Sequence, residues 1–201
     1  MIETIIFDMG KVLIPFDFSR GYQALAPHSP FTAEEIPKEI GKTDLVLRLE
    51  SGQIEPLPFF EEFSSILKTS ISYEEFCNIW SCIFLPDTLI PEEFIATLRK
   101  HYRMLVLSNT NAIHFEMVSV NYPILKHFDH LVLSHEVGAM KPDPKIYNAA
   151  IANANCAAEN CFFTDDIPAY VEGARLAGLN AEQFLGFDKL QHDLNKHGVA
   201  W

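Results

Sequence analysis

Four short stretches of the chain are almost continuously apolar, without the alternation of apolar and polar residues that marks a half-exposed strand. They are TIIF at 4–7, MLVL at 104–107, HLVL at 130–133 and CFF at 161–163. Unbroken apolar runs are typical of strands covered on both faces, as in a parallel sheet between two layers of helices. The pattern therefore predicts four buried, parallel strands.

Helix-like segments alternate with these runs. Residues 91–102 begin with a proline, carry acids in the first turn and bases in the last, as helices favour. Asp143 is a candidate N-cap for a helix over 143–155, and Gly178 is a candidate C-cap for a helix over 166–178. The alternation predicts an α/β fold with a Rossmann-like, doubly wound parallel sheet.

The interval from residue 16 to residue 88 breaks this alternation, because it is helix-like throughout and offers no further strand. SYEE at 72–75 has the Ser-x-x-Glu form of a capping box, and aromatic residues are dense here. We expect the aromatic side chains to form a core of their own rather than a ligand cage. We therefore predict a helical cap over 16–88, inserted into a core domain made of 1–15 and 89–201.

Composition narrows the classes of partner. The 201 residues are 48% hydrophobic and 21% charged, with a net charge of −12, so the chain can bury a core and presents an acidic surface. An acidic surface repels nucleic acid and anionic membranes, and we expect neither as a partner. No signal peptide and no apolar stretch of about 18 residues is present, so we expect a cytoplasmic protein. No motif indicates the oligomeric state.

Polar residues follow the predicted strands directly. They are Asp8, Ser108 with Asn109, Ser134, and Asp165 with Asp166, and Lys141 follows in the loop after the third run. Each has an ordinary explanation on its own, as a turn, a cap or a surface residue. Ligands bind at the carboxyl ends of parallel strands, however, so their joint placement predicts a functional site. The eight histidines, by contrast, show no ligand spacing that joins these strand ends. Four residues separate Cys77 from Cys82 and Cys156 from Cys161, which suggests metal pairs, but these cysteines lie in apolar helix-like and strand-like sequence rather than in tight loops. We therefore expect the four cysteines to be buried, reduced thiols rather than metal ligands.

These segments, taken in order, resemble the motifs of the haloacid dehalogenase superfamily. IIFDMGKVLI (5–14) is similar to the first motif, LVLSNT (105–110) to the second, GAMKPDPKIY (138–147) to the third and FFTDDIPAYVEGARLAGL (162–179) to the fourth. ESGQI (50–54) also resembles a cap segment of the branch that includes sugar-1-phosphate phosphatases and epoxide hydrolase phosphatase domains.

The resemblance implies a Mg²⁺-dependent phosphatase acting on a small phosphorylated metabolite, with sugar phosphates as one class. Asp8 would be the nucleophile and form an aspartyl phosphate, with Lys141 beside it and the phosphoryl oxygens. Ser108 and Asn109 would hold the other phosphate oxygens. The implied ligands of Mg²⁺ are the Asp8 carboxylate, the Gly10 carbonyl and the Asp166 carboxylate. Asp165 would lie behind the metal or bind it through a water.

Two positions depart from the family pattern. Tyr170 stands where the family usually has Asn or Asp four residues after Asp166. Gly10 stands where most phosphatases of the superfamily carry a second Asp, which protonates the leaving group and then activates water. Such a group contributes roughly 10²–10⁴-fold to the rate.

Three interpretations of Gly10 follow. In the first, which we favour, the enzyme acts on leaving groups that need little protonation. In the second, a cap residue such as Asp17, or a water, supplies the proton. In the third, the protein binds phosphorylated metabolites with slow or no hydrolysis. A 2-haloacid dehalogenase is a further alternative, against which stand Gly10 and the acidic Asp165–Asp166 pair.

Overall fold

The computed structural model describes all residues, 1–201. Its sheet has five parallel strands in the order β3-β2-β1-β4-β5. The strands are β1 (Thr4–Phe7), β2 (Arg103–Ser108), β3 (His130–Leu133), β4 (Cys161–Asp165) and β5 (Asn180–Gln183). The first four are the strands predicted from the apolar runs, and β1, the central one, is buried along its whole length.

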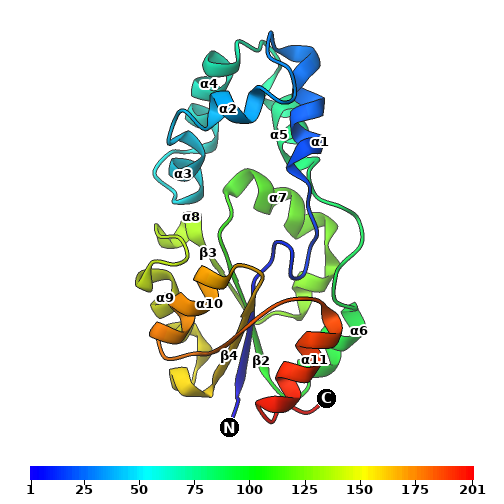
Figure 1. Cartoon of the computed structure of the whole chain (residues 1–201), viewed down its shortest axis with the longest axis vertical. Coiled ribbons are helices and arrows are strands. Elements are labelled where there is room, and N and C mark those ends of the chain that lie inside the picture. Colours follow the sequence, from blue (N-terminus) through cyan, green and yellow to red (C-terminus); the bar gives the residue numbers. More distant parts are fainter.

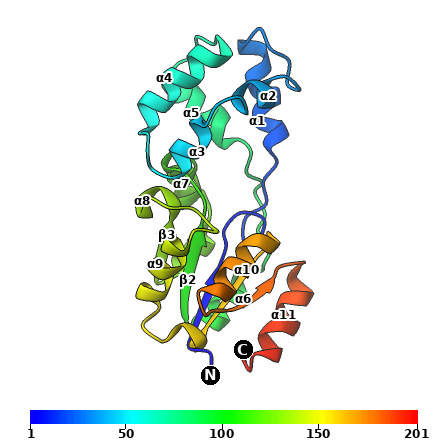
Figure 2. The same ribbon diagram turned by 60° about the vertical axis from the view of Figure 1, so that its left-hand side comes forward.

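Helices cover both faces of the sheet (Figures 1 and 2). We call residues 1–15 and 89–201 the sheet region. Its helices are α6 (Glu92–Leu98), α7 (Ala112–Asn121), α8 (Ser134–Val137), α9 (Pro144–Ala154), α10 (Pro168–Leu176) and α11 (Phe187–Lys196), with 3₁₀ helices η2 (Pro123–His127) and η3 (Ala158–Asn160). One apolar cluster joins the sheet to α6, α7 and α11, and a second joins its other face to α9 and α10. The doubly wound prediction is confirmed.

The predicted helix boundaries hold with small shifts. Asp143 caps α9 by accepting the backbone N–H of Lys145 at 2.8 Å, and Gly178 follows α10 with a φ of +92°. Pro91 precedes α6 as its N-cap residue and is not its first helical residue. All four cysteines are free thiols, of which Cys161 is buried and the others partly buried.

The cap segment forms a helical body beyond the carboxyl ends of the strands (Figure 1). It contains α1 (Phe18–Leu25), η1 (Ala26–His28), α2 (Ile36–Ile40), α3 (Leu45–Glu50), α4 (Pro56–Leu67) and α5 (Tyr73–Ser81). A third apolar cluster, built around Phe59, Phe63 and Phe76, fills it. Ser72 caps α5, accepting the N–H of Glu75 at 3.2 Å.

Two connecting segments of the chain join the cap to the sheet region, and they run side by side. Phe16 and Phe84 form an antiparallel bridge, and the N–H of Asp17 donates to the carbonyl of Ile83 at 2.9 Å. None of the helices combines the length and apolar character that crossing a bilayer requires. The fold thus places a helical layer opposite the strand ends where the sequence predicts a site.

Candidate active site

Lys141 lies at the centre of a buried ion-pair chain at the strand ends. Its Nζ is 2.7 Å from Asp8 Oδ1 and 2.6 Å from Asp165 Oδ2, and it also donates to the carbonyl of Leu107 at 3.0 Å. Burial is the largest single influence on the pKa of Lys141 and lowers it, but Asp8 and Asp165 together raise it more. The pKa of Lys141 therefore lies above its ordinary value. Its side chain is 1% exposed, so the ammonium is held in one position between the ends of β1, β2 and β4.

Asp8, Asp165 and Asp166 form an acidic cluster whose carboxylate oxygens lie within 4.8 Å of one another. One ammonium cannot balance three carboxylates, so the cluster carries an excess of negative charge. Burial raises the pKa of Asp8 to about 7, and Asp165 adds to this, while Lys141 opposes it. Burial and Asp165 likewise raise the pKa of Asp166. A divalent cation with a preference for hard oxygen ligands fits this set of donors and would relieve the repulsion.

The two acids of the fourth motif have different surroundings. Asp165 is fully buried, and both its oxygens are engaged: Oδ2 with Lys141 and Oδ1 as acceptor of the Ile167 N–H at 2.8 Å. Asp166 is half-buried, and its carboxylate has no hydrogen-bond or ion-pair partner on another residue. The oxygens of Asp166 are therefore available to a ligand, whereas those of Asp165 are committed to the protein.

Asn109 fastens the backbone of Lys141. Its Oδ1 accepts the Lys141 N–H at 2.8 Å, and its Nδ2 donates to the Lys141 carbonyl at 3.1 Å and to the Tyr170 hydroxyl at 3.4 Å. The ring of Tyr170 also faces Lys141 Nζ, 5.2 Å from its centroid, an arrangement that favours a cation. The side chain of Asn109 thus positions the lysine, and its predicted contact with phosphate stays a prediction. Tyr170 supports the site where the family pattern has Asn or Asp.

Ser134, another of the predicted strand-end residues, has a structural role, because it connects the sheet region to the cap. It is fully buried, and its Oγ accepts the Thr110 N–H at 2.9 Å and lies 2.6 Å from the carbonyl of Glu50 in the cap. His135 lies next to it in α8, with Nδ1 3.2 Å from the Thr110 carbonyl. Both residues hold loops together and neither reaches the acidic cluster.

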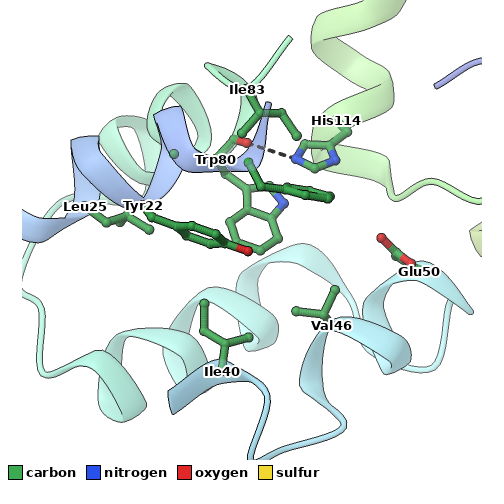
Figure 3. A pocket seen from close by; sticks show the side chains of 10 residues that line it. Tyr22, Leu25, Ile40, Val46, Glu50, Trp80, Ile83 and His114 are labelled. Carbon is green, nitrogen blue, oxygen red and sulfur yellow. Dashed lines mark hydrogen bonds between the residues drawn. The ribbon is translucent and has the colours of Figure 1, made fainter. Parts of the chain in front are cut away.

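A cavity of about 420 Å³, part of it open to solvent, lies between the strand ends and the cap. Its lining includes Gly10, Ser108 and Asn109 from the sheet region. A second, mainly apolar cavity of about 530 Å³ of empty space lies within the cap, lined by residues such as Tyr22, Ile40 and Trp80 (Figure 3). Four residues line both cavities: Phe18, Glu50, Ile83 and His114. The two cavities therefore adjoin.

Two ionisable residues at this junction escaped the sequence analysis. Burial raises the pKa of Glu50 to about 7, and its carboxylate has no hydrogen-bond or ion-pair partner. Burial lowers the pKa of His114 to about 4. Glu50 stands within the ESGQI segment, which was the available signal. His114 was one of eight scattered histidines, and no spacing distinguished it.

Gly10 has no room for a side chain in this structure. A Cβ added there would lie 2.7 Å from Cε1 of Phe16, and the Phe16 ring packs edge-on against Phe18 with centroids 4.9 Å apart. Asp17, the cap residue considered as a proton donor, is exposed and caps α1 by accepting the Ser19 N–H at 2.9 Å. The space that a second aspartate would take is therefore filled by an aromatic ring.

Comparison with known families shows which family this chain belongs to. The model of a family described as haloacid dehalogenase-like hydrolases matches residues 2–178. The chain belongs to the haloacid dehalogenase-like hydrolases. This confirms the resemblance drawn from the four motifs and agrees with the observed sheet.

Two proteins named as phosphatases are similar to this chain over most of their length. The chain is 28% identical over 207 aligned positions to D-ribitol-5-phosphate phosphatase of Bacteroides thetaiotaomicron, with 100% of this chain and 95% of that protein covered. It is 28% identical over 188 positions to a phosphatase of Mycobacterium tuberculosis, covering 90% of this chain and 86% of that protein.

A solved structure shares the fold. A haloacid dehalogenase family enzyme of B. thetaiotaomicron, in complex with magnesium and inorganic phosphate, superposes with a TM-score of 0.84 at 24% identity, covering 96% of this chain and 98% of that one. At this identity the likeness shows the fold alone.

Proposed function

We propose that this protein is a Mg²⁺-dependent phosphatase that hydrolyses a small phosphorylated metabolite through an aspartyl phosphate on Asp8. The observation that carries the proposal is the buried Asp8–Lys141–Asp165 chain with the unpartnered Asp166 beside it. A rigid carboxylate next to a fixed ammonium suits nucleophilic attack on an anionic group, because the ammonium offsets the repulsion between nucleophile and phosphate.

In this proposal Asp8, the Gly10 carbonyl and Asp166 hold the metal. Asp165 does not bind it directly, since its two oxygens already have partners. Bound Mg²⁺ would neutralise charge on the phosphate and on Asp8. Lys141 stabilises the phosphoryl oxygens during transfer, and Ser108, which is 1% exposed and lines the cavity, binds another of them. The cap excludes bulk water and selects the substrate.

The substrate is a phosphomonoester whose alcohol part fits the adjoining cap cavity. The relatives named as phosphatases, one of them for D-ribitol 5-phosphate, support a sugar or polyol phosphate. The apolar lining of the cap cavity, with Tyr22, Ile40 and Trp80, favours in addition an alcohol with a nonpolar face. Both kinds of phosphate therefore belong in a first screen.

The test is phosphate release from a panel of sugar, polyol, alkyl and aryl phosphates, with Mg²⁺ or with EDTA. We expect release that requires Mg²⁺ and is lost in Asp8→Asn. Asp188→Asn, which alters an exposed acid in the first turn of α11, is the matched control and should keep full activity. Hydrolysis that persists in Asp8→Asn would exclude Asp8 as the nucleophile.

A second candidate function, binding of phosphorylated metabolites without hydrolysis, is favoured by one observation. Gly10 offers no acid or base, and Phe16 fills the space where one would stand. Under this alternative, wild type releases no phosphate from any member of the panel but binds one of them with Mg²⁺ in calorimetry.

A further inference from the structure

Glu50 is an ionisable residue at the junction of the two cavities. It is carried by α3 in the cap and lines both the cavity at the strand ends and the apolar cavity behind it. Figure 3 shows its carboxylate pointing into the cavity from the side opposite Tyr22 and Leu25. Glu50 is partly buried, and its carboxylate has no hydrogen-bond or ion-pair partner in the protein, so its oxygens are available to a group that enters the cavity.

We propose that Glu50 is the general acid and base of this phosphatase, in place of the aspartate that Gly10 lacks. The proposal rests on the proposed function and names a further catalytic residue for it. It favours the second interpretation of Gly10, a proton supplied from the cap, over the first.

The geometry of phosphoryl transfer supports this position. The attacking and leaving oxygens lie roughly in line on opposite sides of phosphorus. Asp8 attacks from the end of β1, so the leaving oxygen points away from the sheet and toward the cap. Glu50 lies on the cap side, between the cavity that includes Ser108 and Asn109 and the cavity that would receive the alcohol.

Two contacts between cap and sheet region fix the backbone at this position. The Glu50 carbonyl lies 2.6 Å from Ser134 Oγ, at the start of α8. Gly52, two residues later, packs so closely on α8 that a Cβ would lie 2.1 Å from the His135 carbonyl oxygen. A catalytic group on a cap must be held against the sheet region, and these contacts hold Glu50 there.

Other ionisable groups near the cavities are less suited. His114 is neutral and fully engaged: a carbonyl only accepts, so Nε2 donates to the Trp80 carbonyl at 2.9 Å, and Nδ1 accepts from the Asn111 amide at 3.1 Å. Burial raises the pKa of the Tyr22 and Tyr170 hydroxyls further above neutral pH. Burial of Glu50, by contrast, brings its pKa to about 7, where acid and base forms are both accessible.

The proton balance of the two steps is complete. In the first step an Asp8 oxygen bonds to phosphorus, the bond from phosphorus to the alcohol oxygen breaks, and protonated Glu50 gives its proton to that oxygen. In the second step the Glu50 carboxylate takes a proton from water as the water oxygen bonds to phosphorus. The bond from phosphorus to Asp8 then breaks, which releases phosphate and restores both residues.

The test compares wild type, Glu50→Gln, Asp8→Asn and the control Glu61→Gln, an exposed cap glutamate, on phosphates ordered by leaving-group acidity. We expect Glu50→Gln to lose roughly 10²–10⁴-fold on alkyl phosphates. With 4-nitrophenyl phosphate, whose leaving group needs no proton, the variant should show a burst of one equivalent of nitrophenol and then slow turnover. Wild type should depend only weakly on leaving-group acidity, a result that does not require any variant to fold.

Different failures have different meanings. Three results overturn the role of Glu50 and leave the proposed phosphatase activity standing. Glu50→Gln is as active as wild type on alkyl phosphates, or it loses activity equally on all leaving groups without a burst. The third is a steep dependence of wild-type activity on leaving-group acidity. Wild type without activity on any phosphate, or activity that persists in Asp8→Asn, overturns the proposed function and the role of Glu50 with it.

Discussion

The contact between Gly52 and α8 makes a quantitative prediction about how the cap is held. Gly52 has a φ of +67° and Gly138 has a φ of +68°, so alanine at either position pays the same backbone penalty, about 1–2 kcal/mol. The surroundings differ. A Cβ at Gly52 would lie 2.1 Å from the His135 carbonyl oxygen, whereas one at Gly138 has its nearest neighbour, Lys145 Nζ, at 3.4 Å.

The difference between the two variants therefore isolates the steric contact between cap and sheet region. The carbonyl oxygen is backbone and belongs to α8, so relief requires the cap segment to move by about 1 Å. Overpacking of this kind costs about 1–3 kcal/mol. We expect Gly52→Ala to lower the free energy of unfolding by about 2–5 kcal/mol and Gly138→Ala by about 1–2 kcal/mol.

Urea denaturation followed by circular dichroism measures these losses, and phosphate release measures their effect on the site. Gly52→Ala should also lose activity, because it displaces the backbone that carries Glu50, while Gly138→Ala should keep it. Equal losses of stability in the two variants, or full activity in Gly52→Ala, would refute the reasoning that this contact positions the cap.

Three further results are expected. Glu50 binds its proton more tightly in the folded state, because burial raises its pKa from the ordinary value of 4.5 to about 7, so stability should fall as pH rises between these values. The free energy of unfolding from urea denaturation should be greater for Glu50→Gln than for wild type by about 1–2 kcal/mol at about pH 8, and the two should match at about pH 4. His114, with its pKa lowered to about 4, should keep a neutral ring in an NMR titration from about pH 8 to about pH 6, where ordinary histidines begin to protonate; a shift with a midpoint near 6.5 would contradict its burial as the cause. Gly10→Ala should lower the free energy of unfolding by about 1–3 kcal/mol. The loss should be clearly smaller in a Phe16→Ala background, because the added Cβ would meet the Phe16 ring. A double-mutant cycle with no coupling between the two positions would show that the ring is not the obstacle.

The sequence predicted most of the sheet because buried parallel strands leave a clear signature. β1 to β4 are apolar runs, and their carboxyl ends bring Asp8, Lys141 and Asp165 together. β5 was missed because its sequence, NAEQ, is polar: it pairs only with β4 at the edge of the sheet and is buried at Ala181 alone. Edge strands need not be apolar on both faces, so their pattern is weak.

The part of the site that comes from the cap could not be predicted in the same way. The position of Glu50 depends on how the cap meets the sheet region, through Ser134 and through the absence of a side chain at Gly52. Neither contact has a periodicity or spacing that sequence reasoning could detect. Likewise, Gly10 reads as a missing group in the sequence, and only the structure shows Phe16 occupying its space.

The most direct test of the central claim is to look for the phosphoryl group on Asp8. Wild type is mixed with Mg²⁺ and a phosphomonoester that it hydrolyses, quenched in acid during turnover, digested and analysed by mass spectrometry. We predict one added phosphoryl group on the peptide that contains Asp8, and none in Asp8→Asn. Steady phosphate release with that peptide unmodified and the phosphoryl group on another residue would contradict the mechanism.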